Sequence, residues 1–175
     1  MIRGAACLAL ALAVDARAAG PDAALNACAL ITPEEVSAVL GAKVGPADRK
    51  DAGTTDDGAY SSTCIWKLAD APKVSDKPDA PFGGAGFAML NTITWPGGPE
   101  AAKKYLQDFY DAAKQNLIDN NPIPVQAGDE ALWWGDGVAV RKGAVSFGVS
   151  VHINDDKKAE QRMEEALAKK IAGRL

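Results

Sequence analysis

Three segments of the chain alternate apolar and polar residues with the period of two that is typical of a β-strand with one buried face. They are residues 60–68, 87–95 and 145–153, and the last is the most regular. Residues 130–134 and 138–140 are shorter apolar runs, which we also interpret as strands.

Three other segments carry apolar residues three or four positions apart, which is the spacing of one helix face. Thr32 and Glu35 predict a capping box at the start of the first, and Gly41 predicts its end. The predicted helices cover residues 33–40, residues 99 to the break at 120–122, and residues 155–175. The apolar stripe of the second reaches Leu117, and that of the third consists of Ala159, Met163, Ala166, Leu167, Ile171 and Leu175.

The predicted order of elements is α-β-β-α-β-β-β-α. Residues 42–59 and 70–84 are polar and rich in glycine, aspartate or proline, so we expect loops there. Strands joined by short turns favour an antiparallel sheet, and helices with one apolar stripe are expected to cover it. The sequence therefore predicts an α+β fold with an antiparallel sheet of about five to six strands. The chain has 175 residues, of which 47% are apolar, so we expect a single domain over residues 19–175.

The N-terminal segment has the pattern of a bacterial signal peptide. Arg3 supplies a positive charge, residues 4–14 are small and apolar, and residues 16–18 have the small-x-small form that signal peptidase accepts. The apolar run is too short for a permanent membrane helix. We expect residues 1–18 to be removed, with cleavage after Ala18 or Ala19, and the protein to be periplasmic or secreted, with no membrane span.

The chain has three cysteines, of which two follow the expected leader. Cys7 lies inside the apolar run, whereas a lipid-attachment cysteine would follow it, so we do not expect a lipid anchor. Cys28 and Cys64 form an even number in an oxidising compartment, which favours a disulfide between them. Two free buried thiols are the alternative.

Charge and side-chain chemistry exclude several classes of function. A net charge of -4 argues against nucleic acid, whose binding needs a basic face. His152 is the one histidine, and the sequence has no Gly-x-Ser-x-Gly elbow, so a catalytic triad is not expected. Asp155 and Asp156 suit the N-terminus of the last helix better than a metal ion. We expect no catalytic residue, no metal and no cofactor.

Aromatic residues provide the candidate binding site. Trp133 and Trp134 are neighbours on a predicted strand, so their rings are expected to point to opposite faces. An exposed indole near Asp136 and Arg141 would suit a sugar, a peptide or a protein partner. Trp133, Trp134 and Arg141 are therefore the candidate ligand-binding residues. The alternative is that helices cover both faces at this place and both rings belong to the core.

Several short motifs, taken in order, resemble those of a known family. They are residues 28–41 (CALITPEEVSAVLG), 64–66 (CIW), 127–133 (AGDEALW) and 140–145 (VRKGAV), followed by the last helix. The series resembles the secreted domain-of-unknown-function lipoproteins best known from actinobacteria. Those are similar to PsbP-like lipoproteins and, more distantly, to extracellular sensor domains of receptor kinases. The resemblance covers nearly all of the mature chain and implies a PsbP-like sandwich, a cysteine pair at Cys28 and Cys64, and no catalytic residues. The chain lacks the lipobox cysteine of that family.

These observations predict a non-enzymatic, monomeric envelope domain that binds a small molecule, glycan or peptide between sheet and helices. The alternative is a protein-interaction or inhibitor module of the periplasm, docking through residues 42–59 and 70–84. A hydrolase would need two titratable groups that converge in a cleft.

Overall fold

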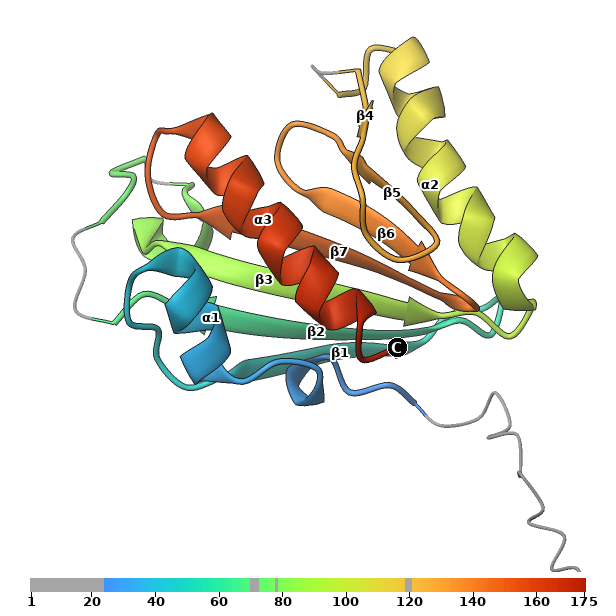
Figure 1. Ribbon diagram of the computed structural model, residues 1–175, viewed down its shortest axis with the longest axis horizontal. Coiled ribbons are helices and arrows are strands. Elements are labelled where there is room, and N and C mark those ends of the chain that lie inside the picture. Colours follow the sequence, from blue (N-terminus) through green and yellow to red (C-terminus); the bar gives the residue numbers. More distant parts are fainter. Residues whose placement is uncertain (1–23, 70–72, 78, 119–120) are drawn as a thin grey trace, which may run out of the picture.

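An antiparallel sheet with helices on both faces makes up the protein, as a computed structural model shows (Figure 1). The structure describes residues 24–69, 73–77, 79–118 and 121–175, so the expected leader, residues 1–18, lies outside the described residues. The helices are α1 (Pro33–Leu40), α2 (Gly98–Lys114) and α3 (Lys157–Ala172), with two short 3-10 turns, η1 (Ala27–Ala29) and η2 (Pro81–Gly84). The strands are β1 (Asp48–Thr54), β2 (Tyr60–Lys67), β3 (Phe87–Thr94), β4 (Ile123–Pro124), β5 (Glu130–Trp133), β6 (Val138–Lys142) and β7 (Val145–His152).

The strands follow the order β1-β2-β3-β7-β6-β5-β4 across the sheet. At the centre, β3 pairs with β7 from Phe87, opposite His152, to Thr94, opposite Val145. Both edges resist pairing with further chains, because β4 contains a proline and β1 carries charged residues over 48–51.

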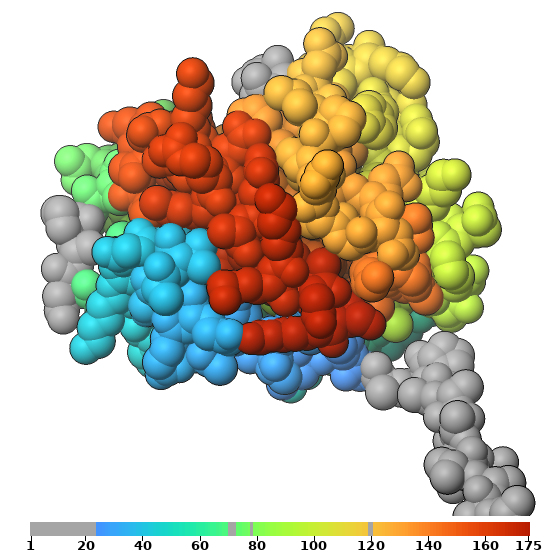
Figure 2. Space-filling model, in the orientation of Figure 1, coloured from blue at the N-terminus to red at the C-terminus, as the bar shows by residue number. Residues whose placement is uncertain are grey.

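The two faces of the sheet are covered differently. α1, η1 and α3 lie on one face, where α1 and α3 are side by side (Figures 1 and 2). α2 lies on the other face, where Leu106 packs with Leu132 of β5 and Ala139 of β6. Over β1, β2 and β3, no helix of the described chain covers this second face. Its side chains there are partly polar, and the Asn91 amide donates to Thr63 Oγ1 at 2.8 Å.

The first helix forms as its sequence predicts. Thr32 Oγ1 accepts the Glu35 N–H at 3.3 Å, and the Glu35 carboxylate accepts the Thr32 N–H at 3.1 Å. Gly41 ends the helix with a φ of 64°, which favours glycine. The Arg174 guanidinium, just beyond α3, donates to the Leu30 carbonyl and pairs with Glu35, so the end of α3 is joined to the start of α1.

A disulfide joins Cys28 of η1 to Cys64 of β2, with the two Cα atoms 5.0 Å apart. Cys64 is buried in the main core, and the bridge ties the segment before α1 to the sheet. A cross-link over 36 positions restricts the unfolded chain, which stabilises the fold by about 3–4 kcal/mol in the chain-entropy account.

The α+β class and the antiparallel sheet are confirmed, but the sheet has seven strands rather than five or six. Residues 42–59, expected to be a loop, contain β1. This edge strand is exposed along most of its length, so its sequence carries no apolar alternation. β4 has only two residues, too few to produce an alternating pattern in the sequence.

Two helix predictions also need correction. α2 ends at Lys114 rather than near 120, because Asn116 takes a φ of 55° and turns the chain out of the helix. Leu117 is consequently 71% exposed instead of belonging to the apolar stripe. α3 buries Glu160 and Glu164 together with Leu167 and Ile171, whereas Leu175 is exposed.

Candidate functional site

A cavity of about 380 Å³ lies at the edge of the fold where β3 begins and β7 ends. Its walls come from residues 74–77 and 79–85, between β2 and β3, and from the connector between β7 and α3; both loops are seen at the left of Figure 1. Phe87 and His152 line it from the sheet. Its polar and charged lining residues are Ser75, Lys77, Asp79, Asn154, Asp155 and Lys157. We call this cavity the loop pocket; its volume is typical of small-molecule sites.

The first wall of the loop pocket depends on a close backbone contact. The Gly84 carbonyl accepts the N–H groups of Val74 at 2.8 Å and Ser75 at 3.3 Å. Gly84 has a φ of 83°, and a Cβ at this position would lie 1.8 Å from the Ser75 carbonyl oxygen. Only glycine fits here, so the glycine-rich segment shapes the wall.

An aromatic group joins this wall to the sheet. The rings of Phe87 and His152 lie 5.0 Å apart, and Phe82 of η2 meets Phe87 edge-on at 4.7 Å. The Lys67 ammonium lies 5.2 Å from the centre of the Phe82 ring, within the range of a cation–π contact. The pocket therefore presents an apolar, aromatic side beside its charged groups.

The second wall, the β7–α3 connector, is held by a buried carboxylate. Glu160 Oε1 accepts the N–H groups of Ile153 at 2.9 Å and Asn154 at 3.3 Å. The Lys157 ammonium lies 3.4 Å from Glu160 Oε2 and 2.9 Å from Asp136 Oδ1. Two carboxylates thus balance the charge of the Lys157 ammonium, and Lys157 also lines the pocket.

A second buried carboxylate lies one turn further along α3. Glu164 Oε1 accepts the Val151 N–H at 3.0 Å, and Glu164 Oε2 accepts the Trp133 indole N–H at 3.0 Å. Burial raises the pKa of Glu164 to about 7, against the opposing effect of these two hydrogen bonds. A carboxyl group with such a pKa changes its charge near neutral pH.

The structure does not bring Trp133, Trp134 and Arg141 together. Both tryptophans are half-buried against a helix: Trp133 bonds to Glu164 of α3, and Trp134 packs near Phe109 of α2 with ring centres 5.7 Å apart. A helix therefore lies against each ring, while both rings stay partly exposed. Arg141 pairs with Asp129 at 3.2 Å. The ligand-binding role of these three residues stays a prediction.

A second hollow, of about 530 Å³, lies at the other end of the uncovered sheet face. It is lined by Ile93 of β3, by Trp95 just after that strand, and by the β1–β2 hairpin, including Asp56 and Asp57. The Asp57 carboxylate accepts the Ala59 N–H at 3.3 Å and the Thr55 hydroxyl, and these hydrogen bonds lower its pKa. The rim of this hollow is therefore anionic at neutral pH.

Glu160 and Glu164 are not among the residues predicted from the sequence, although their positions carried a signal. Residues 160, 164, 167 and 171 follow one helical stripe, so the two glutamates continue the face of Leu167 and Ile171. Their hydrogen-bond partners lie on other elements and could not be read from the helix alone.

The described part of the chain contains no group of three histidine, cysteine, aspartate or glutamate side chains that could hold a metal ion. No helix among the residues that the structure describes is long and apolar enough to cross a membrane. Comparison with protein-family models, with curated proteins and with solved structures finds no match for this chain.

Proposed function

We propose that the chain is a non-enzymatic, exported binding domain that holds a small molecule, glycan or peptide in the loop pocket. The observation that carries this proposal is the pocket itself, about 380 Å³ in volume, with an aromatic side and charged groups on two facing loops. Export is supported by the disulfide, which forms and persists in oxidising compartments.

The lining of the loop pocket favours a ligand that is both apolar and charged. Phe87 and His152 offer ring surface, while Lys77 and Asp79 offer charges of opposite sign. Pockets of this kind use apolar contact for affinity and a few polar groups for orientation.

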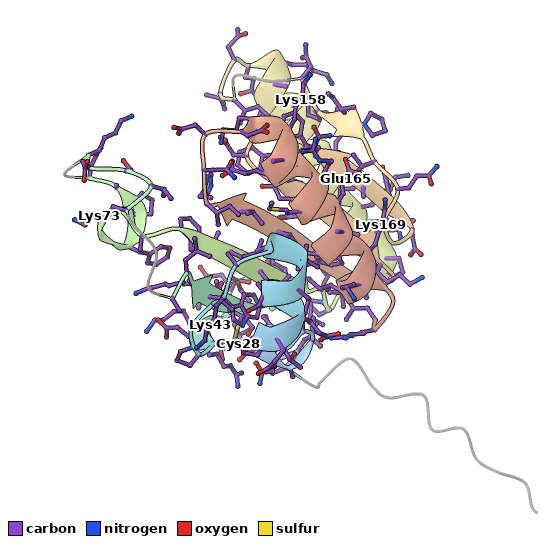
Figure 3. The ribbon with its side chains drawn as sticks, turned by 60° about the vertical axis from the view of Figure 1, so that its left-hand side comes forward. Cys28, Lys43, Lys73, Lys158, Glu165 and Lys169 are labelled. Carbon is purple, nitrogen blue, oxygen red and sulfur yellow. A yellow bond between two sulfur atoms is a disulfide. The ribbon has the colours of Figure 1, made fainter. Side chains whose placement is uncertain are left out.

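Native mass spectrometry of protein exported by a bacterial host tests the proposal, because it detects a ligand that is retained during purification. Lys77→Ala and His152→Ala should each weaken retention by about ten-fold, which corresponds to about 1.4 kcal/mol. Lys73→Ala is the matched control: this exposed lysine belongs to the same loop, outside the lining residues (Figure 3). A bound mass that all three variants keep equally, or no bound mass at all, would contradict the proposal.

The second hollow favours a protein-interaction module as the second candidate. An indole, two aspartates and a hairpin wall suit a cationic side chain of a partner protein, because carboxylates and the face of an indole both attract a cation. This hollow lies on the second face of the sheet, in the part over β1, β2 and β3 where no α-helix of the described chain covers it.

N-acetylargininamide is a suitable probe for this candidate, with the neutral N-acetylcitrullinamide as its matched control. The indole N–H resonance of Trp95 should shift with the first probe only. Asp56→Asn should weaken that response, whereas Asp76→Asn, an exposed aspartate of the other loop, should leave it unchanged. Equal responses to both probes would exclude recognition of the charge.

A further inference from the structure

β7 extends beyond its neighbour β6, so backbone amides at its end have no partner in β6. Side chains of α3 accept hydrogen bonds from these amides. β6 begins at Val138, opposite Val149, so the next alternate amides of β7 have no strand partner on that side. These amides are the N–H group of Val151 and that of Ile153, which directly follows β7, and they donate to Glu164 and Glu160. The two carboxylates occupy the place of a strand.

Helix and strand geometry explains why glutamates four residues apart suit this task. Four residues of a helix advance by about 6 Å, and two residues of a strand advance by about 6.7 Å. The nearly equal distances let carboxylates on successive turns meet every second amide of a strand. The pairing order is reversed, since Val151 meets Glu164 and Ile153 meets Glu160. We call Glu160 and Glu164 the carboxylate pair.

Ionised carboxylates suit the site because they only accept hydrogen bonds. Each member of the carboxylate pair meets donors with both oxygens: Glu164 also accepts from Trp133, and Glu160 also contacts Asn154 and Lys157. Their side chains are nevertheless almost fully enclosed, with 1% of Glu164 and 2% of Glu160 exposed. Enclosure of a charged carboxylate costs free energy, which protonation removes.

The carboxylate pair also fixes one wall of the loop pocket. The donors of Glu160 include Asn154 and Lys157, which line the pocket, and His152 lies between the two paired amides. We propose that Glu164 is a proton-responsive latch: it holds the end of β7, which leads into the β7–α3 wall of the loop pocket, most firmly when protonated, and it opens more easily as the pH rises towards neutrality. The link to ligand binding rests on the proposed function, whereas the latch itself does not.

The charged groups around Glu164 are few. On its own helix they are Glu160, which raises its pKa, and Lys157, which lowers it. The β6 residues in the core beneath α3, Val138 and Val140, are apolar, as is Val149 of β7. On the neighbouring helix, Glu35 is bound to Arg174 near the far end of α3. Enclosure therefore has the largest effect and raises the pKa of Glu164 from 4.5 to about 7.

Hydrogen exchange measured by NMR tests the latch without a ligand. Opening exposes Glu164 to water, so the opening constant should rise by about 40-fold between pH 5 and pH 7 and level off above neutrality. The amides of Val151, Ile153 and Asn154 should show this rise after correction for intrinsic exchange. The Val149 amide, which lies where β6 and β7 still pair, is the internal control.

Two further measurements make the test specific. The side-chain carboxyl resonance of Glu164 should titrate near pH 7, and the backbone resonances of His152 and Asn154 should follow the same midpoint. Trp133→Phe removes one hydrogen bond from the ionised form, so it should move that midpoint upward; this variant does not depend on the folding of Glu164→Gln. A Glu164 midpoint near 4.5, exchange without the expected rise, or a titration that leaves His152 and Asn154 unchanged would each overturn the proposal. A titrating latch in a protein that retains no ligand would refute only the proposed function.

Discussion

Two fastenings hold the same face of the sheet to the elements above it, and they differ in chemistry. At β2, the Cys28–Cys64 disulfide joins η1, just before α1, to the sheet. At β7, the carboxylate pair of α3 accepts backbone amides. The first is covalent and responds to reductant, whereas the second responds to protons.

The difference lies in what each fastening controls. Neither cysteine lines the loop pocket, so the disulfide stabilises the fold without forming a wall of that site. The carboxylate pair contacts Asn154 and Lys157 of the pocket wall directly. Reductant is therefore expected to change stability alone, whereas pH is expected to change both stability and the pocket wall, and experiments that vary one condition at a time can separate the two.

Reduction of the disulfide is expected to have the largest effect. Reduced wild-type protein should lose about 3–4 kcal/mol of unfolding free energy relative to oxidised protein, because the unfolded chain regains its freedom. Urea titrations with and without reductant measure this loss, and no residue has to change in the core.

Cys28→Ser with Cys64→Ser provides the control, since reductant should not alter this double variant. Reduction of the wild type should leave the pH-dependent exchange of Val151 unchanged. Equal stability of oxidised and reduced wild-type protein would show that the bridge contributes nothing.

Elements with a local chemical pattern were predictable from the sequence. Thr32, Glu35 and Gly41 specify α1 through groups within the same ten residues, and the alternation of residues 145–153 specifies β7. β1 has no such pattern, because backbone pairing with β2 places it in the sheet while its side chains face water. β1 is therefore a strand because it pairs with β2, and its own side chains give no sign of this.

The candidate site was less predictable than the fold, because its residues also depend on partners from other elements. His152 and Phe87 come from strands whose register sets them opposite each other. A backbone contact brings Gly84 and Ser75 together, and no short sequence motif predicts it. The two tryptophans lie on opposite faces, as their adjacent positions predict, but the helix that packs against each ring depends on the tertiary fold.

The pH dependence of stability is the second prediction, and it concerns the carboxylate pair. The pKa of Glu164 is about 7 in the folded protein and 4.5 in an ordinary environment, so the folded state binds the proton more tightly. This contribution is complete below pH 4.5 and is lost as the pH rises to 7. It amounts to about 3 kcal/mol, which urea titrations between pH 4.5 and pH 8 should reveal.

Glu164→Gln isolates this effect, because glutamine does not titrate. The variant should lack this part of the pH dependence and should be less stable than the wild type at low pH, where an amide N–H₂ would face a donor N–H group. An identical pH dependence in both proteins would show that Glu164 stays ionised throughout.

The smallest effect is expected at the cap of α1, and it tests whether α1 responds to protonation at β7. Thr32→Ala should cost about 1 kcal/mol, because it removes the hydroxyl that accepts the Glu35 N–H. This cost should be equal at pH 5 and pH 8: the contact with Arg174 lowers the pKa of Glu35, whose carboxylate stays charged across that range. Thr54→Ala, at an exposed position of β1, should change stability by less than about 0.5 kcal/mol. A cost for Thr32→Ala that varies with pH would mean that protonation at β7 is felt at α1, through the contact between the two helices.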